Sequence, residues 1–116
     1  TIRKAIKMFR KVGIRVKGFF IVGLPGEDHI SIAATKRFID EVPLDFADFT
    51  IYQPYRGSPI WDNLQEYDVE WDGLLDHDRF YKGKPGGYHC HVRTSALSPQ
   101  EIVDAREGLD RYFNEQ

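Results

Sequence analysis

The chain has 116 residues, 41% of them hydrophobic, and a formal net charge of −2. This length and composition predict one globular domain, or a piece of one, rather than a disordered chain. The small net charge gives no reason to expect a nucleic acid or an anionic membrane as partner, and no apolar run reaches the length of a membrane span.

The first 25 residues predict a helix and a strand. Apolar residues at helical spacing predict a helix over residues 1–12, with Gly13 as its C-cap. Residues 14–24 begin with alternating polarity and become continuously apolar. Such a pattern is typical of a strand that is buried on both faces in a parallel sheet. Because helical periodicity starts at Thr1, we expect a chain cut from a longer parent protein.

A second helix and a second strand follow. Residues 27–42 predict a helix whose apolar face carries Ile30, Ala34 and Phe38, and Pro43 ends it. Residues 48–53 predict the strand. Ser58 and Pro59 then predict the N-cap and first turn of a short helix that runs to about residue 67. This order of elements is the repeating unit of a parallel α/β fold.

The pattern changes after residue 67. A Gly/Pro turn over residues 82–87 predicts a hairpin, and Ser98, Pro99 and Glu101 predict a capped helix near the C-terminus. Four aromatic residues in this part are expected to form a small core rather than a cofactor site: Trp71, Phe80, Tyr81 and Tyr88.

The joint over residues 18–27 is the main candidate for a ligand site. A buried strand runs into a glycine turn and then a helix start, and α/β folds bind ligands at the C-terminal ends of such strands. A phosphate loop is disfavoured because no Gly-Lys-Ser/Thr follows. An ordinary strand–turn–helix joint without a ligand is the alternative.

These residues resemble the fifth-strand motif of radical S-adenosylmethionine (SAM) enzymes, G-x-I-x-G-x-x-E, in its longer form I-V-G-L-P-G-E. The matching positions are Ile21, Gly23 and Glu27. In that family the isoleucine packs on the adenine of SAM, and the glycine and glutamate shape the strand end. The resemblance therefore implies that these three residues belong to a cofactor site.

Residues 49–59 are similar to the sixth strand of the same barrel and its P-Y-x-G-[ST]-P turn. The family's backbone at this strand touches adenine, which implies that Tyr52 and Gln53 also bind the cofactor. Residues 92–102 resemble the tail of cobalamin-domain members, including anaerobic magnesium-protoporphyrin IX monomethyl ester oxidative cyclases. A capped helix alone explains most of this third pattern.

The resemblance implies an α/β fold made of the late β/α units of a partial, TIM-like radical SAM barrel over residues 1–67, with a small α+β appendage over residues 68–116. The parent oxidoreductase would use SAM and a [4Fe–4S] cluster, and possible use of cobalamin follows from the tail. Its cluster loop, C-x-x-x-C-x-x-C, is not in this chain, whose single cysteine is Cys90. We therefore expect the chain to contribute part of the adenine site and barrel wall, and to be inactive alone.

A second group of candidate metal ligands is formed by His89, Cys90 and His91. On a strand the two histidines share one face and the cysteine points the other way, so the three do not easily bind one ion. His77 could approach across a hairpin. Solvated or packed side chains are the favoured interpretation, and no metal site is predicted. Four acidic residues are likewise expected on the solvated surface: Asp40, Glu41, Asp76 and Asp78.

The alternative function is that of a non-catalytic α/β domain that binds a ligand or a protein. A start codon near Thr1 would favour it, whereas an upstream C-x-x-x-C-x-x-C would favour the enzyme. The expected partners are the remainder of the parent barrel and a small-molecule substrate, in the cytoplasm. Since the strands near 14–24 and 48–53 would lack barrel neighbours, we also expect self-association.

Overall fold

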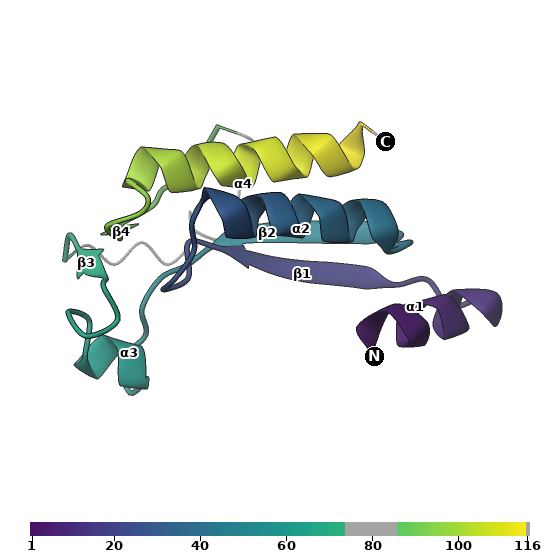
Figure 1. The fold of residues 1–116 in the computed structure, drawn as a ribbon, viewed down its shortest axis with the longest axis horizontal. Coiled ribbons are helices and arrows are strands. Elements are labelled where there is room, and N and C mark those ends of the chain that lie inside the picture. Colours follow the sequence, from purple (N-terminus) through teal and green to yellow (C-terminus); the bar gives the residue numbers. More distant parts are fainter. Residues whose placement is uncertain (74–85, 116) are drawn as a thin grey trace.

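Two parallel strands, covered on one face by two helices, form the centre of the fold (Figure 1). The computed structural model describes residues 1–73 and 86–115. Strand β1 (Lys17–Val22) pairs in parallel with β2 (Phe46–Ile51), and helix α2 (His29–Glu41) connects them. The predicted parallel β–α–β order is confirmed, whereas its membership in a barrel stays a prediction.

Local sequence signals explain where the helices begin. Helix α2 starts after Asp28, whose carboxylate accepts a hydrogen bond from the backbone N–H of Ser31 at 2.8 Å, and the Ser31 hydroxyl bonds back to the Asp28 N–H at 3.0 Å. Helix α4 (Pro99–Asn114) has the same reciprocal arrangement between Ser98 and Glu101, as predicted. Each such cap satisfies backbone donors that the first turn leaves unpaired.

Helix α4 lies along β2 and closes the core. Its Ile102 and Leu109 are buried against residues of both strands. Phe49 of β2 is 1% exposed and stacks on Phe20 with 5.1 Å between ring centroids. The core also contains these buried residues: Val22, Ile39, Ile51, Val69, Tyr88, Val92 and Leu97.

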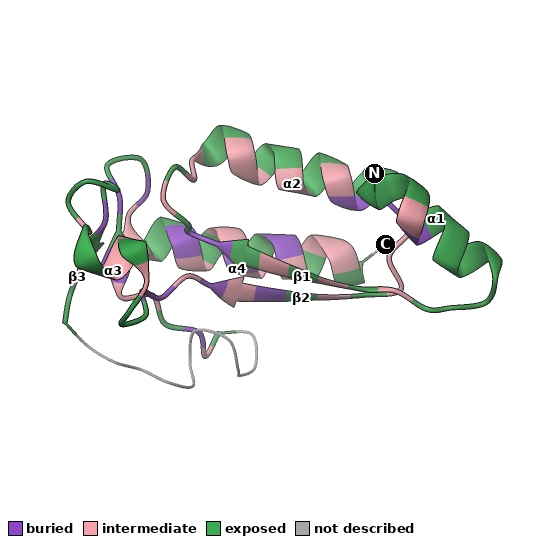
Figure 2. Ribbon diagram, turned by 90° about the horizontal axis from the view of Figure 1, so that it is seen from below, coloured by how far each residue is buried: buried purple, intermediate pink, exposed green. Residues whose placement is uncertain are grey.

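The prediction that β1 is buried on both faces is wrong for this chain. Burial alternates along the strand, and the side chains of Phe19 and Ile21 are 73% and 51% exposed. The physical reason is that α2 and α4 lie on the same face of the sheet (Figure 1), so the opposite face carries no helix from residues 1–73 and 86–115 (Figure 2). We call this uncovered side, with Phe19 and Ile21, the open face.

The predicted apolar face of α2 is also only partly right. Phe38 packs edge-on against Phe20, with 6.1 Å between ring centroids, but Ile30 is 77% exposed and Ala34 is exposed. Ile39 is the residue that α2 buries most deeply. The helix begins beyond the end of β1, so its first turn has no strand beneath it to pack on.

Helix α1 (Ile2–Lys11) precedes β1 and is largely exposed. Only Ile6 of this helix is buried among the described residues. Arg3 pairs with Glu41, and Arg10 lies 3.5 Å from Asp45. Such exposed ion pairs contribute little stability, so α1 is held weakly.

The segment after β2 forms small elements beyond the C-terminal ends of the strands (Figure 1). Helix α3 (Pro59–Asp62) starts at Ser58 as predicted but ends before residue 67, because Asn63 leaves helical geometry. Strand β3 (Glu70–Trp71) pairs antiparallel with β4 (Val92–Arg93). The predicted hairpin partner, Phe80–Tyr81, lies outside the described residues, as do Asp76, His77 and Asp78. Tyr88 joins the core, whereas Trp71 is half-buried beside it.

Candidate functional site

The C-terminal ends of β1 and β2 meet at one edge of the sheet. The backbone N–H of Tyr52 donates to the carbonyl of Val22 at 2.8 Å, so the pairing continues one residue past β2. The first turns of α2 and α4 lie beside this edge and are joined by His29 and Glu101, whose Nε2 and Oε2 are 2.9 Å apart. This edge is where α/β folds place ligands.

Ile21 lies on the open face close to this edge. Its register partner is Thr50, whose hydroxyl donates to the Phe20 carbonyl at 3.2 Å and is thereby satisfied within the sheet. Toward the other end of the open face, Lys17 and Asp48 form an ion pair at 2.8 Å. The open face therefore carries Ile21 beside Thr50 near the strand ends, and the ion pair beside the exposed ring of Phe46 near the strand starts.

Gly23 has a packing role that sequence reasoning did not identify. Its φ is +94°, a left-handed conformation that L-residues with a side chain rarely adopt. A Cβ atom at this position would lie 2.9 Å from Cγ2 of Ile102. Gly23 thus lets α4 approach the strand end, and a role in cofactor binding remains a prediction.

The side chain of Glu27 points to its own helix. Its carboxylate accepts a hydrogen bond from the Ser31 hydroxyl, and its backbone N–H donates to the Leu24 carbonyl at 2.9 Å. Glu27 therefore stabilises the turn between β1 and α2. This contact agrees with a glutamate that shapes the strand end, and nothing in it requires a ligand.

Tyr52 and Gln53 follow β2 at the same edge. Tyr52 is half-buried, and burial raises the pKa of its phenol above the usual value. Gln53 is 4% exposed, and its Oε1 atom has no hydrogen-bond partner among the described residues. An unsatisfied buried acceptor costs about 1–3 kcal/mol, so a hydrogen-bond donor that reached this enclosed oxygen would stabilise the fold.

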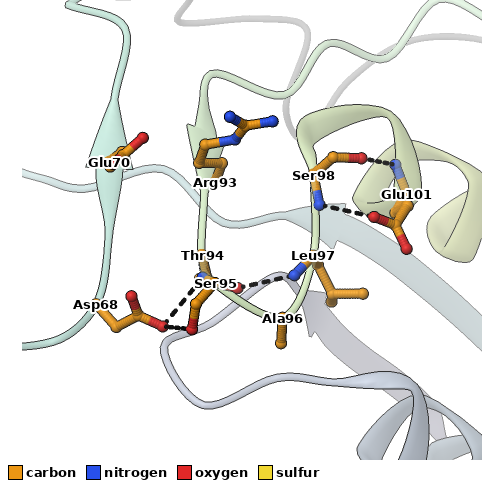
Figure 3. A pocket seen from close by; sticks show the side chains of 9 residues that line it. All are labelled: Asp68, Glu70, Arg93, Thr94, Ser95, Ala96, Leu97, Ser98 and Glu101. Atoms are coloured by element: carbon orange, nitrogen blue, oxygen red, sulfur yellow. Dashed lines mark hydrogen bonds between the residues drawn. The ribbon is translucent and has the colours of Figure 1, made fainter.

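A polar pocket of about 380 Å³ lies between β3, β4 and the start of α4 (Figure 3). Asp68, at a positive φ of 58°, accepts hydrogen bonds from the backbone N–H and the hydroxyl of Ser95, at 3.0 and 2.5 Å. Glu70 and Arg93 are direct register partners of opposite charge. The sequence alone does not indicate this pocket, because β3–β4 pairing brings together segments more than twenty residues apart. Its polar groups mainly serve caps and turns.

Asp68 gives this region a pH dependence. The two bonds from Ser95 hold the pKa of Asp68 below its usual value. A carboxyl group whose pKa is lower in the folded state than in the unfolded state stabilises the fold at pH values above its unfolded-state pKa. This stabilisation is lost as the pH falls through the folded-state pKa. We therefore expect Asp68→Asn to melt below the wild type at neutral pH, with the gap closing in acid, as followed by circular dichroism. A gap independent of pH would contradict this assignment.

The His89–Cys90–His91 group is not arranged around a common point. His91 Nδ1 lies 2.7 Å from Asp72 Oδ2, while the two imidazole rings are 6.3 Å apart at nearly a right angle. The thiol of Cys90 donates to the Val92 carbonyl, and burial raises its pKa to about 11. A neutral thiol is a poor metal ligand and a poor nucleophile. Within residues 1–73 and 86–115, no set of three or more His, Cys, Asp or Glu side chains could hold a metal ion.

The residues present fit the adenine part of SAM better than they fit an iron–sulfur cluster. Ile21 offers an apolar surface and Gln53 an unsatisfied acceptor at the same strand edge. A [4Fe–4S] cluster is held by cysteine thiolates, and the chain has one cysteine. The cluster ligands of any such enzyme must therefore lie outside this chain.

Comparison with known proteins gives one partial likeness. The chain is 38% identical over 58 residues, half of its length, to an uncharacterized methyltransferase of Pyrococcus horikoshii. The matched segment makes up 13% of that protein. No family model and no solved structure matches the chain. None of the helices in the described parts is long and apolar enough to span a membrane.

Proposed function

We propose that this chain is part of a radical SAM enzyme and that the open face, at the C-terminal ends of β1 and β2, borders the adenine of SAM. The observation that carries the proposal is the position of Ile21. It is an apolar side chain, half-exposed, on the uncovered side of a parallel strand next to a glycine turn. In a TIM-like barrel the helices cover the outside, so the uncovered side of a strand faces the interior.

The chain's own residues would act by binding and orientation. Ile21 supplies an apolar surface for a ring, Gln53 supplies a buried acceptor, and Glu27 holds the turn that follows Gly23. SAM, bound together with a cluster held by other parts of the parent, would supply the radical chemistry. The partial likeness to a protein named a methyltransferase is compatible with this proposal.

The deciding experiment replaces Ile21 in the full-length parent. An aspartate there would place an unpaired carboxylate on a dry, apolar surface, which is strongly disfavoured. We expect Ile21→Asp to weaken SAM binding at least about tenfold (~1.4 kcal/mol), measured by calorimetry, while iron content and circular dichroism stay normal. Ile21→Val, which removes one methylene, is the matched control and should bind SAM nearly as the wild type does.

The isolated chain provides the folding control. Because Ile21 is half-exposed, Ile21→Asp should leave its circular dichroism unchanged. The isolated wild type should bind SAM weakly or not at all, since the cluster ligands are missing. Normal SAM binding by a folded full-length Ile21→Asp would remove Ile21 from the adenine site. It would then favour the alternative of a non-catalytic binding domain.

The finer assignment within the family rests on residues 92–102 alone. We infer from their resemblance that the parent belongs to the cobalamin-domain members. Cobalamin extracted from the purified parent would support this inference, and a cobalamin-free parent with full activity would contradict it.

A further inference from the structure

The charges of the chain are divided unevenly along its length. Residues 1–26 carry seven Lys or Arg and no Asp or Glu, whereas the rest of the chain carries nine basic and 18 acidic residues. Because exposed charges are screened beyond about 8–10 Å, a surface attracts partners through its local charge. The small net charge of the chain thus conceals a strongly basic N-terminal segment.

Helix α1, in this segment, has a basic half and an apolar half. Helical spacing places all of its charged residues on one half, and every one of them is basic: Arg3, Lys4, Lys7, Arg10 and Lys11. The other half consists of Ile2, Ala5, Ile6, Met8 and Phe9. An apolar half beside a Lys/Arg-rich half is the pattern of helices that lie at a membrane–water interface.

Only a narrow strip of α1 faces the rest of the described chain. Ile6 is buried in this strip. On its basic side, Arg3 pairs with Glu41, and Arg10 lies 3.5 Å from Asp45. Both arginines are therefore directed toward α2 and the turn after it, which leaves the remainder of the helix surface to solvent.

That remainder combines cations with apolar side chains. The three lysines of α1 are exposed and form no ion pair within residues 1–73 and 86–115. Beside them, the side chains of Met8 and Ile2 are 63% and 67% exposed. We call the following residues the α1 surface: Ile2, Lys4, Lys7, Met8, Phe9 and Lys11. It lies at the end of the molecule opposite α3, β3 and β4 (Figure 1) and is exposed along its length (Figure 2).

The composition of the α1 surface favours a lipid bilayer over other partners. Phosphates of a nucleic acid would pair with the lysines but would leave the apolar side chains in water, whereas an anionic bilayer receives both. A second copy of the chain is disfavoured because two α1 surfaces would bring their lysines together. Ten residues of helix are only about 15 Å long, so α1 can lie on a bilayer but cannot cross it.

We propose that the α1 surface docks on an anionic lipid bilayer, with the helix parallel to the membrane. The lysines contact lipid phosphates, and Met8 and Phe9 enter the boundary between headgroups and acyl chains. The candidate site at the C-terminal ends of the strands lies at the other end of the sheet and stays uncovered (Figure 1). This inference is independent of the proposed function because it uses none of the candidate site residues.

Vesicle co-sedimentation of the isolated chain tests the role of the lysines. The chain should bind vesicles of equimolar phosphatidylcholine and phosphatidylglycerol, less so at high salt, and should not bind phosphatidylcholine alone. Lys7→Gln with Lys11→Gln should weaken binding roughly 25-fold, about fivefold for each lysine. Arg93→Gln with Arg111→Gln is the matched control, since it makes the same charge change at exposed positions and should bind as the wild type does. Equal losses in the two double variants, or equal binding to both vesicles, would overturn the proposal.

A second pair of variants tests the apolar half. Met8→Ser should weaken vesicle binding roughly tenfold because it removes a side chain that the bilayer buries, whereas Met8→Leu should bind nearly as the wild type does. Circular dichroism should show both variants folded, since Met8 is exposed. Unchanged vesicle binding by Met8→Ser would overturn the proposal. Tighter binding to an RNA duplex than to the anionic vesicles would also overturn it and make the α1 surface a nucleic-acid site.

The full-length parent provides the last test. It should bind the same anionic vesicles, and the variants should rank in the same order as in the isolated chain. A parent that binds SAM but no vesicles would show that other parts cover the α1 surface, which overturns this inference and leaves the proposed function standing. A parent that binds vesicles through Lys7 and Lys11 but binds no SAM would do the reverse.

Discussion

Replacing Phe49 with alanine is expected to lower the free energy of unfolding of the isolated chain by about 3–5 kcal/mol. Phe49 is almost fully buried, stacks on Phe20 and lies under α4. Removing its ring takes away both the buried apolar area and the contacts of its neighbours, which cannot fully collapse into the space. Thermal unfolding followed by circular dichroism should show a melting point lower by roughly 10 °C or more.

Phe19→Ala is the control for this experiment. Phe19 is also a strand phenylalanine, but its ring lies on the open face, so its removal should change the stability by no more than about 0.5 kcal/mol. If the Phe49→Ala chain does not fold, the smaller change Phe49→Leu should give a folded chain whose loss in free energy of unfolding can be measured. Equal losses for Phe19→Ala and Phe49→Ala would mean that the open face is covered in solution.

The second large effect is expected at Gly23. An alanine there must adopt a positive φ, which costs about 1–2 kcal/mol, and its Cβ would press on Ile102, which adds about 1–3 kcal/mol. We therefore expect Gly23→Ala to destabilise the isolated chain by about 2–5 kcal/mol in chemical denaturation.

A double-mutant cycle identifies the cause. Ile102→Ala alone should cost about 2–5 kcal/mol, but combined with Gly23→Ala it removes the atoms that the new Cβ would strike. The double variant should then be more stable than the sum of the single losses implies. Strict additivity would show that α4 does not constrain Gly23. A stable Gly23→Ala whose parent fails to bind SAM would instead make the glycine a ligand-binding residue.

The order and type of the main elements could be predicted because their signals are local. Ser98 and Glu101 form the cap that starts α4, apolar residues at helical spacing indicate α2, and Pro43 stops α2 just after its last turn. Apolar runs separated by a helix predicted a parallel pair of strands. These features depend on a few neighbouring residues and do not require knowledge of the rest of the chain.

The burial of the strand faces could not be predicted in the same way. A continuously apolar strand is typical of a sheet with helices on both faces. Whether both faces are buried, however, depends on which other elements of the protein pack against the sheet. In the part of the chain that the structure describes, no helix covers one face of β1 (Figure 2), so Ile21 is half-exposed although its sequence context is that of a core residue. The apolar pattern agrees with a face that other parts of a parent would cover, which is the expectation tested by Ile21→Asp.

In the candidate site, too, the sequence predicts some features, whereas others depend on contacts between distant residues. The resemblance of two short motifs to radical SAM enzymes implied a cofactor role for Ile21, Gly23, Tyr52 and Gln53, and the structure places all four at one edge of the sheet. The sequence did not indicate that Ile102 fills the space above Gly23. Helical spacing places Arg106 on the same face as Ile102 and Leu109, but it does not indicate that the Arg106 guanidinium donates a hydrogen bond to the Phe49 carbonyl. Both depend on contacts between distant parts of the chain.

The position of α4 over β2, where Arg106 donates a hydrogen bond to the Phe49 carbonyl, has a consequence for synthesis on the ribosome. The two residues are 57 positions apart, and the helix that covers β2 is the last element of the chain. At a translation rate of about 5–20 residues per second, β1, α2 and β2 would wait roughly 3–11 s for α4. During that interval the nascent chain exposes the apolar side of both strands, and the Phe49 carbonyl lacks its hydrogen bond from Arg106. Chaperones that bind nascent chains would therefore find their main target between the emergence of β2 and the emergence of α4.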